Sequence, residues 1–356
     1  MTPSIVDLDP IDRQLLNEMQ DKFPLVPEPF VELANRIGTS EAGVIARLSA
    51  LRASGVLRQV GPIFDTKALG YQSSLVAMRI PEQRLAAAAA AVNQHPGVSH
   101  NYQRTHAFNM WFTIAVPPGS DLPSHIEALH RLAQAASTRM LPATHLFKIG
   151  VALDMTGERP MDEISEPRYT HEKRERAAGR VLTARDIEVI RAVQGDLPLE
   201  PNPFAAAART LETTVQELVQ ELRELQKRGY LRRFAGIVRH RQAGFGANAM
   251  VVWNAAEDTV LEVGRAMARY TAISHCYQRP TYEDWPYNLF TMIHAREKTE
   301  CDEFVALLAE RHGLADYAML YSTAELKKVR LAYFTPELEV WERRHMRGRA
   351  GSSGVA

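Results

Sequence analysis

The sequence repeats itself, and this feature constrains the possible fold more than any other. The segment 24–30, PLVPEPF, returns as 198–204, PLEPNPF, and the segment 98–104, VSHNYQR, returns as 273–279, ISHCYQR. Each pair matches at five of seven positions, at separations of 174 and 175 residues. Matches in the same order at a nearly constant offset indicate a tandem duplication. We place the two copies at 8–155 and 182–334.

The first part of each copy is helical. In copy one, three short helical patterns cover 9–19, 28–36 and 40–53, with Ser40 or Thr39 as N-cap of the third and Gly55 as its stop signal. A β-ribbon strand over 58–64 follows. Three short helices and a ribbon are typical of a winged helix-turn-helix.

The second part of each copy alternates strands and helices. In copy one we expect strands at 73–80, 98–104, 108–116 and 144–151, and helices at 82–94 and 120–138. The order β-α-β-β-α-β is ferredoxin-like, so the fold class is α+β. The expected divisions are helix-turn-helix-like domains at 8–64 and 182–238, ferredoxin-like domains at 72–155 and 246–334, a charged, proline-containing linker at 156–180, and a disordered tail at 335–356.

Composition excludes several classes of protein. The formal net charge is zero, so no global field attracts DNA or an anionic membrane. The two cysteines match no metal-site spacing, and we expect no metal site and no disulfide framework. We find neither a signal peptide nor an apolar run of membrane-spanning length, and we therefore expect a cytoplasmic protein. Phosphate-binding glycine loops, zinc-protease motifs and hydrolase elbows are also missing from the sequence.

A helix-turn-helix joined to a ferredoxin-like domain resembles the Lrp/AsnC regulators, which favours the hypothesis of a DNA-binding transcription factor. The charge of the helices in the recognition position argues against it. In copy two this segment reads TLETTVQELVQELREL, with four glutamates against one arginine, and in copy one it is close to neutral. Because DNA affinity depends on neutralising phosphates, we do not expect DNA binding.

One strand in each copy carries a row of polar side chains. Residues two apart on a strand share a face, so His100, Tyr102 and Arg104 should lie together. The same spacing in copy two groups His275, Tyr277 and Arg279. A solvated sheet face is the simpler interpretation of one such row. Its repetition favours a functional site, because these groups are seldom buried without a partner.

Further candidates are less distinctive. The third strands carry Asn109 and Trp111 in copy one and Asn288 in copy two. Each asparagine could bind a ligand or finish a turn, and the aromatics could face a flat ligand or only the core. Lys148 and Lys327 align with each other and could contact ligand or solvent. The second wing adds a basic cluster suited to a polyanionic small molecule, consisting of Arg232, Arg233, Arg239, His240 and Arg241.

The combination of these motifs resembles the siroheme decarboxylases, relatives of the Lrp/AsnC regulators, in their fused two-copy form. The resemblance rests on the proline run before the second helix, the Ser-His-x-Tyr-x-Arg strand, the Asn with aromatics, and the ending YST…LKKVRLAYF, over nearly all of 8–334. It implies a carboxy-lyase that removes CO2 from two acetate side chains of siroheme, giving didecarboxysiroheme for haem d1 or alternative haem biosynthesis.

The resemblance also implies roles for individual residues. His100 or His275 would protonate the methylene left by decarboxylation, although a histidine that ligates the siroheme iron is an alternative. Arg104 and Arg279 would bind carboxylates, and Tyr102 and Tyr277 would orient the imidazoles or bond a propionate. The iron belongs to the substrate and the ring is the electron sink, so no added cofactor is expected.

Several questions stay open at this point. The two sites could serve one acetate each or be unequal, because the insertion 280–286 in copy two should alter its pocket. A haem- or amino-acid-responsive regulator and a non-catalytic tetrapyrrole carrier remain alternatives. Siroheme is the expected partner, with no membrane contact, while a homodimer and contacts with tetrapyrrole-pathway enzymes are options.

Overall fold

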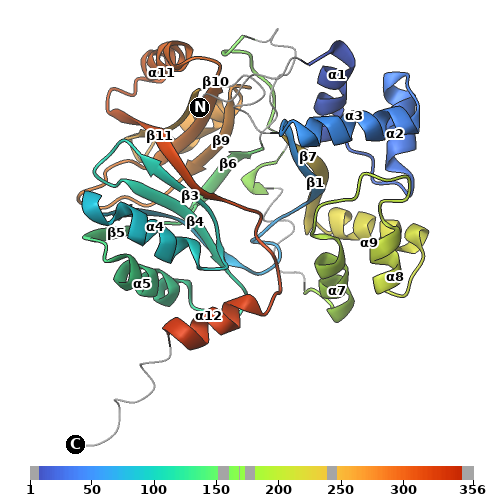
Figure 1. Ribbon diagram of the computed structural model, residues 1–356. Helices are drawn as coiled ribbons and strands as arrows, with labels where there is room; N and C mark the ends of the chain where they lie inside the picture. Colours follow the sequence, from blue (N-terminus) through green and yellow to red (C-terminus); the bar gives the residue numbers. More distant parts are fainter. Residues whose placement is uncertain (1–7, 151–159, 168, 173–180, 239–246, 347–356) are drawn as a thin grey trace, which may run out of the picture.

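The computed structural model describes residues 8–150, 160–167, 169–172, 181–238 and 247–346. Two lobes are visible in Figure 1, one helical and one built on a large sheet. The helical lobe contains the helix-turn-helix units of both copies. Its helices are α1 (Pro10–Asp21), α2 (Pro29–Ile37) and α3 (Glu41–Ala53) from copy one, and α7 (Ala184–Val193), α8 (Ala205–Thr210) and α9 (Val215–Lys227) from copy two.

Local sequence explains where these helices begin and end. Ser40 is the N-cap of α3, and its hydroxyl accepts a hydrogen bond of 3.1 Å from the Gly43 amide. Thr183 and Thr214 begin α7 and α9 with complete capping boxes. The expected stop at Gly55 is confirmed, because its φ of 79° lies in the left-handed region that favours glycine.

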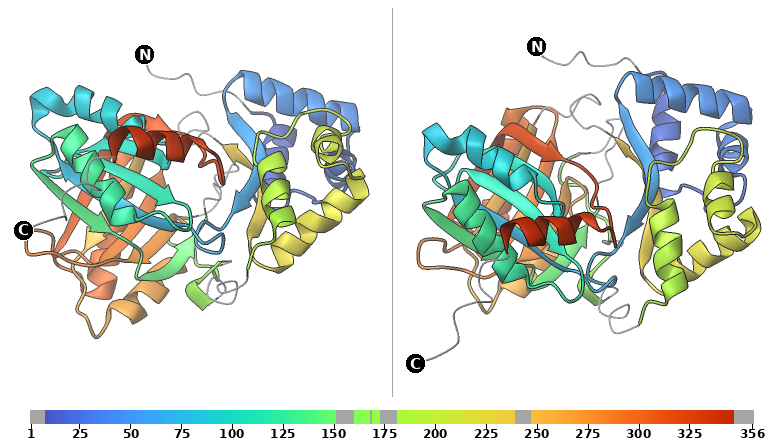
Figure 2. Two further views of the ribbon diagram at one scale, coloured as in Figure 1. Left: turned by 90° about the horizontal axis from the view of Figure 1, so that it is seen from below. Right: turned by 60° about the horizontal axis from the view of Figure 1, so that its bottom comes forward.

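The wings of the two copies form one ribbon. Strand β1 (Leu57–Phe64) pairs antiparallel with β7 (Leu231–Val238), and the two form a separate two-stranded sheet. Helices from both copies share one continuous apolar core with this ribbon. Figures 1 and 2 show the ribbon on the side of the helical lobe that faces the large sheet. The two helix-turn-helix units are therefore a single body.

The second lobe is a nine-stranded sheet in the order β5-β2-β4-β3-β11-β8-β10-β9-β6. Helices α4 and α5 cover the part from copy one, and α10 and α11 cover the part from copy two. The strands are β2 (Gln72–Arg79), β3 (Val98–Arg104), β4 (Met110–Val116), β5 (Ser137–Leu141), β6 (His145–Ile149), β8 (Ala247–Trp253), β9 (Ile273–Gln278), β10 (Leu289–Ala295) and β11 (Tyr317–Lys328). The helices are η1 (Glu82–Arg84), α4 (Leu85–Asn93), α5 (Leu122–Ala133), α10 (Val260–Ala268) and α11 (Lys298–His312).

The two copies exchange the ends of their last strands. The first half of β11 pairs with β8 of its own copy, and its second half pairs with β3 of copy one. In the reciprocal position, β6 of copy one pairs with β9 of copy two. Residues that follow β9 also reach β5: Arg279 donates to the Leu141 carbonyl and the Tyr282 hydroxyl donates to the Met140 carbonyl at 2.6 Å. The segment after β9 is thereby tied to β5, the strand at the opposite edge of the sheet.

The ferredoxin-like prediction is confirmed with one correction. The expected helix 120–138 ends at Ala133, because Gln134 takes a left-handed conformation with φ of 51°. Strand β5 follows, and it is the fourth strand of the copy-one sheet in place of the expected strand 144–151. The latter exists as β6 but belongs to the sheet of the other copy. The sequence of β5, STRML, does not alternate apolar and polar residues, and only one of its five residues is buried. It therefore lacks the pattern that predicts a strand.

The predicted disordered tail is wrong over part of its length. Helix α12 (Glu337–His345) packs on the copy-one core through Leu338 and Trp341. The Trp341 ring lies 4.2 Å from the ring of His95, and the Glu342 carboxylate lies 3.1 Å from His125 Nε2. Residues 347–356 lie outside the described residues.

The described part of the linker also makes contacts. Ile164 forms a β-bridge with Tyr270, and the Tyr169 hydroxyl donates to the Asp65 carboxylate at 2.8 Å. In the part of the chain that the structure describes, no helix has the length and apolar character to cross a membrane.

Candidate functional site

A cavity of about 970 Å³ lies between the ribbon β1–β7 and the concave face of the nine-stranded sheet. Both copies contribute to its walls. The ribbon supplies residues such as Arg58 and Arg233, and the sheet supplies residues of β2, β3, β4, β8, β9 and β10. The segment between β11 and α12 closes one side through Val329, Arg330 and Tyr333. The exchange of strands thus builds one cavity from two copies.

The two polar rows face this one cavity. His100, Tyr102 and Arg104 line it from β3, and His275, Tyr277 and Arg279 line it from β9 or directly after it. The prediction that each row shares a face is confirmed. In copy one the imidazole and phenol rings lie 6.3 Å apart at 27°, and in copy two 6.2 Å apart at 26°. The expectation of two separate pockets is corrected, because both rows border the same space.

Burial lowers the pKa values of both histidines and favours their neutral form. The pKa of His100 is lowered to about 4 by burial and by the positive charges of Lys328 and Arg58. The pKa of His275 is lowered to about 3 by burial, by Arg232 and by other nearby cations. In both cases the ring Nδ1 is engaged by the preceding serine, at 3.0 Å from Ser99 and 2.9 Å from Ser274. Both imidazoles border the cavity.

The two arginines of the rows are tied to the exchanged strands. Arg104 Nη1 donates to the Leu320 carbonyl at 2.8 Å, and Arg279 makes the equivalent bond to Leu141. Each guanidinium also lies over the tyrosine of its own row, 5.4 Å from the Tyr102 ring and 4.7 Å from the Tyr277 ring. Burial lowers the pKa of Arg104 to about 10, which leaves it charged at neutral pH. These arginines therefore hold the fold as well as line the cavity.

The lining is strongly cationic. Among the lining residues that the structure describes there are eight lysines and arginines and no aspartate or glutamate. The cations are Arg58, Lys67, Arg104, Arg232, Arg233, Arg279, Lys328 and Arg330. Such a wall repels cations and attracts an anion with several charges. Apolar walls accompany it, from Trp111, Phe112, Phe290 and Met292, so a large flat anion suits the space.

Only part of this basic lining is marked by a pattern in the sequence. Arg232 and Arg233 are in the cavity as the basic cluster predicts, whereas Arg239, His240 and Arg241 lie outside the described residues. Arg58, Lys67, Lys328 and Arg330 were missed. The first two lie far apart in the sequence from the rows, so no local pattern marks them. The run LKKVR did signal a basic strand end, but not which lysine faces the ligand.

Four candidates are not in the cavity. Asn109 exchanges two hydrogen bonds with the backbone of Ile80, at 2.9 and 2.8 Å, and Asn288 does the same with Ala255 at 3.0 and 2.8 Å. Lys148 Nζ donates to the Tyr270 carbonyl at 2.7 Å. These three side chains and that of Lys327 complete backbone hydrogen bonding, so their assignment to ligand binding is corrected.

Lys327 lies next to the lysine of β11 that does border the cavity. Its Nζ donates to the Asn93 carbonyl at 2.6 Å and to the His95 carbonyl at 3.2 Å, outside the cavity. The next residue, Lys328, lines the cavity. Neighbouring residues of a strand point to opposite faces, so an error of one position moves the ammonium group to the other side of the sheet.

Trp111 lines the cavity as expected, and its indole N–H donates to the Phe108 carbonyl at 2.6 Å. The insertion 280–286 does not reach the cavity lining. Its Trp285 is fully buried 5.1 Å from the Trp111 ring, and its Asp284 pairs with Arg139 at 2.8 Å. The insertion packs on copy one, so the expectation that it alters a second pocket is corrected.

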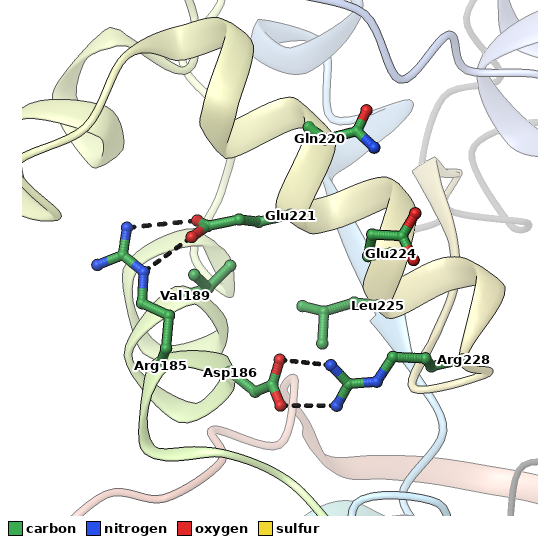
Figure 3. Close-up of a pocket in the computed structure, with 8 residues that line it drawn as sticks. All are labelled: Arg185, Asp186, Val189, Gln220, Glu221, Glu224, Leu225 and Arg228. Carbon is green, nitrogen blue, oxygen red and sulfur yellow. Dashed lines mark hydrogen bonds and ion pairs between the residues drawn. The ribbon is translucent and has the colours of Figure 1, made fainter.

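Charged side chains of the helices in the recognition position form ion pairs with neighbouring segments. Figure 3 shows Glu221 of α9 paired with Arg185 of α7, at 2.9 Å, and Arg228 paired with Asp186, at 2.6 Å. In copy one, Arg47 of α3 pairs with Asp9 at 2.6 Å and with Asp12 at 2.8 Å. Glu224, which lies on the same helix in Figure 3, is 3.9 Å from the ammonium group of Lys227.

Two family models match the chain, each in both copies. An "AsnC-like ligand binding domain" matches residues 68–148 and 242–327, and a "Siroheme decarboxylase NirDL-like HTH domain" matches 12–58 and 186–232. Siroheme decarboxylase of Hydrogenobacter thermophilus is 39% identical over 329 residues, covering 92% of this chain and 96% of that protein.

Solved structures agree with this similarity. The crystal structure of the siroheme decarboxylase NirDL is 35% identical, has a TM-score of 0.72, and covers 94% of this chain and 98% of its own. A second structure of NirDL, in co-complex with an iron-uroporphyrin III analogue, has a TM-score of 0.71 with the same identity and coverage.

Proposed function

The chain belongs to the siroheme decarboxylase family, and from that premise we propose that it removes CO2 from two acetate side chains of siroheme and releases didecarboxysiroheme. The observation that carries the proposal is the single cavity with two His-Tyr-Arg rows, eight cationic side chains and no carboxylate among its described lining. Siroheme is a flat conjugated ring with several carboxylates, and NirDL has been crystallised with an iron-uroporphyrin III analogue.

The cations would bind and orient the substrate. Arg58 lies on strand β1 of the ribbon, and Arg330 lies just after β11. Arg104 lies at the end of the sheet strand β3, and Arg279 directly follows β9. Carboxylates around the edge of the ring would therefore meet positive charge from both sides. A hydrogen bond between charged partners contributes about 1.5–3 kcal/mol. Siroheme binding should accordingly weaken as each of these cations is removed.

Decarboxylation needs an electron sink and a proton. The C–C bond to the carboxylate breaks, CO2 leaves, and the electron pair stays on the methylene, from which the macrocycle delocalises it. The methylene then takes a proton to become a methyl group. His100 and His275 border the cavity, and because the preceding serine engages Nδ1 of each ring, their Nε2 atoms are our proposed donors. Bound carboxylates would offset the cations that depress the histidine pKa values, and would thus help the imidazoles of the cavity to hold a proton.

The other elements of the proposal follow from this arrangement. The ring is both substrate and electron sink, so the reaction needs no further organic cofactor, and the iron enters with the substrate. The product would serve haem d1 or alternative haem biosynthesis. The two copies already pair within one chain as the subunits of a dimer would, so a homodimer and contacts with pathway enzymes are additional to the site.

The test is anaerobic incubation of the purified protein with siroheme, followed by mass analysis of the extracted tetrapyrrole. We expect loss of two CO2 per macrocycle, dependent on His100 or His275. Siroheme that stays bound but unchanged would instead identify a carrier or sensor. Normal turnover with an altered visible spectrum in His100→Ala or His275→Ala would assign that histidine to the iron rather than to proton transfer.

A further inference from the structure

His100 and His275 differ in the second partner of the serine that contacts their Nδ1. In copy one the Ser99 hydroxyl lies 3.0 Å from His100 Nδ1 and 2.9 Å from the hydroxyl of Thr113. In copy two the Ser274 hydroxyl lies 2.9 Å from His275 Nδ1 and 3.0 Å from Nε2 of a second histidine, His294. A serine thus joins two imidazoles in copy two, but an imidazole and a hydroxyl in copy one.

The register of the sheet shows how this difference arises. His294 on β10 lies opposite Asn248 on β8, and in copy one Ala115 on β4 lies opposite Ser73 on β2. His294 therefore occupies the position that Ala115 holds in copy one. A methyl group cannot exchange a proton, so the connection behind the catalytic histidine exists in one copy and not in the other.

The contacts of Ser274 suit proton transfer. A hydroxyl group can donate one hydrogen bond and accept two. Ser274 has three neighbours, namely the two imidazole nitrogens and the Met292 carbonyl, to which it donates at 3.2 Å. Ser274 and His294 are both largely buried, with 4% and 9% of their surface exposed, and His294 also borders the cavity, so a ligand that fills the cavity would keep bulk water from these partners. The carbonyl is the longest of the three contacts, and the hydroxyl proton can turn from it to His275 Nδ1.

We propose that His294 is a positioning residue that supplies His275 with a proton through Ser274. The inference rests on the proposed decarboxylation. In the step, a neutral His275 that carries its proton on Nε2 gives this proton to the methylene carbanion, the Ser274 hydroxyl proton moves to His275 Nδ1, and a protonated His294 gives its Nε2 proton to Ser274. His275 and His294 both end neutral, Ser274 is restored, and one proton is consumed for each CO2 released.

Among the residues that the structure describes, copy one places no second imidazole at the serine beside its histidine. Thr113 can orient the Ser99 hydroxyl, but a threonine hydroxyl does not ionise in the neutral range. His100 must therefore take its next proton from the cavity itself. The two histidines are unequal donors although their rows are alike, and the two decarboxylation steps should respond differently to loss of His294.

The test uses the full chain under anaerobic single-turnover conditions with siroheme, with mono- and didecarboxylated products separated by mass. The variant His294→Gln keeps an N–H in place of Nε2 to donate to Ser274 but cannot release that proton. His130→Gln is the matched control, because His130 bonds the Thr138 hydroxyl at 2.9 Å and does not line the cavity. A visible titration gives siroheme affinity for each.

We expect His294→Gln to bind siroheme as the unsubstituted protein does and to accumulate the mono-decarboxylated product, with one step slowed by about 10- to 100-fold, a part of what general acid catalysis supplies. Its solvent deuterium isotope effect on that step should also change. In His294→Ala, added imidazole should restore part of the rate.

Three results would overturn the proposal. His294→Gln could match His130→Gln in both steps, it could slow both steps equally with an unchanged isotope effect, or its rate could fall only in proportion to siroheme affinity. If the unsubstituted protein leaves siroheme unchanged in the same assay, the proposed function itself fails, and the two failures are thereby distinguished.

Discussion

The guanidinium of Arg104 donates a hydrogen bond of 2.8 Å to the carbonyl of Leu320, so a residue of the first copy holds the last strand of the second. Arg279 makes the reciprocal bond to Leu141. Both bonds lie where a strand crosses from one copy to the other. The side chains that line the cavity are therefore also those that keep its two halves together.

We expect Arg104→Met to lower both stability and siroheme affinity. The buried carbonyl of Leu320 loses a charged donor, which costs about 1.5–3 kcal/mol in the free energy of unfolding. Urea unfolding measures this cost, and a visible titration measures the affinity. Arg131→Met, at an exposed position of α5, is the control and should change neither. An unfolding free energy equal to that of the control would contradict the structural role of Arg104.

Adjacent lysines on β11 should have different functions. Lys328→Met removes a cation from the cavity wall and should weaken siroheme binding by about 10- to 100-fold, the equivalent of one charged hydrogen bond. Lys327→Met should leave affinity unchanged but reduce stability, because the Asn93 and His95 carbonyls lose their donor. Titration and unfolding of both variants test this. A reversed pattern would mean that the strand presents its other face to the cavity.

The free protein should lose stability as the pH falls below about 6.5. The unfolded chain takes up protons at its histidines near this pH, whereas burial holds the folded pKa at about 4 for His100 and about 3 for His275. The unfolded state then binds more protons, so stability is fully present above pH 6.5 and is lost as the pH falls toward the folded values. Each pKa unit corresponds to about 1.4 kcal/mol.

The double variant His100→Asn, His275→Asn should therefore show a shallower fall in Tm between pH 6.5 and 4. Part of the fall should persist, because the buried His95, whose pKa is lowered to about 2 mainly by burial, remains. Thermal unfolding across this range, at constant ionic strength, is the measurement. A pH profile unchanged by the double substitution would show that these imidazoles are not buried in the neutral form.

Helix α12 should contribute to substrate retention although it is outside the cavity. Glu342 accepts from the Ser120 hydroxyl at 2.8 Å and contacts His125, and this holds the segment that carries Arg330 and Tyr333. Glu342→Ala should cost about 1–3 kcal/mol and speed both tryptic cleavage after Arg343 and siroheme release. Val340→Ala, at an exposed side chain of the same helix, is the control. Equal cleavage and release rates in the two variants would disprove the anchoring role.

Much of this protein follows from the sequence alone. The duplication, the helix-turn-helix and ferredoxin-like units, and the two polar rows depend on local patterns, namely repeated motifs, helix caps and the two-residue period of strands. A row such as His100, Tyr102 and Arg104 is on one face whatever the strand pairs with. The acidic character of α9 is also a property of the sequence, and the structure adds only that its charges are paired with α7.

Tertiary structure decided what the patterns could not. Strand pairing between distant segments merged two expected pockets into one cavity, because β6 and β11 each cross to the other copy. It also decided which side of the sheet each lysine reaches, and it assigned Asn109 and Asn288 to the backbone. The connection from His275 to His294 joins residues on neighbouring strands. Such contacts depend on register between strands, which a linear sequence does not encode locally.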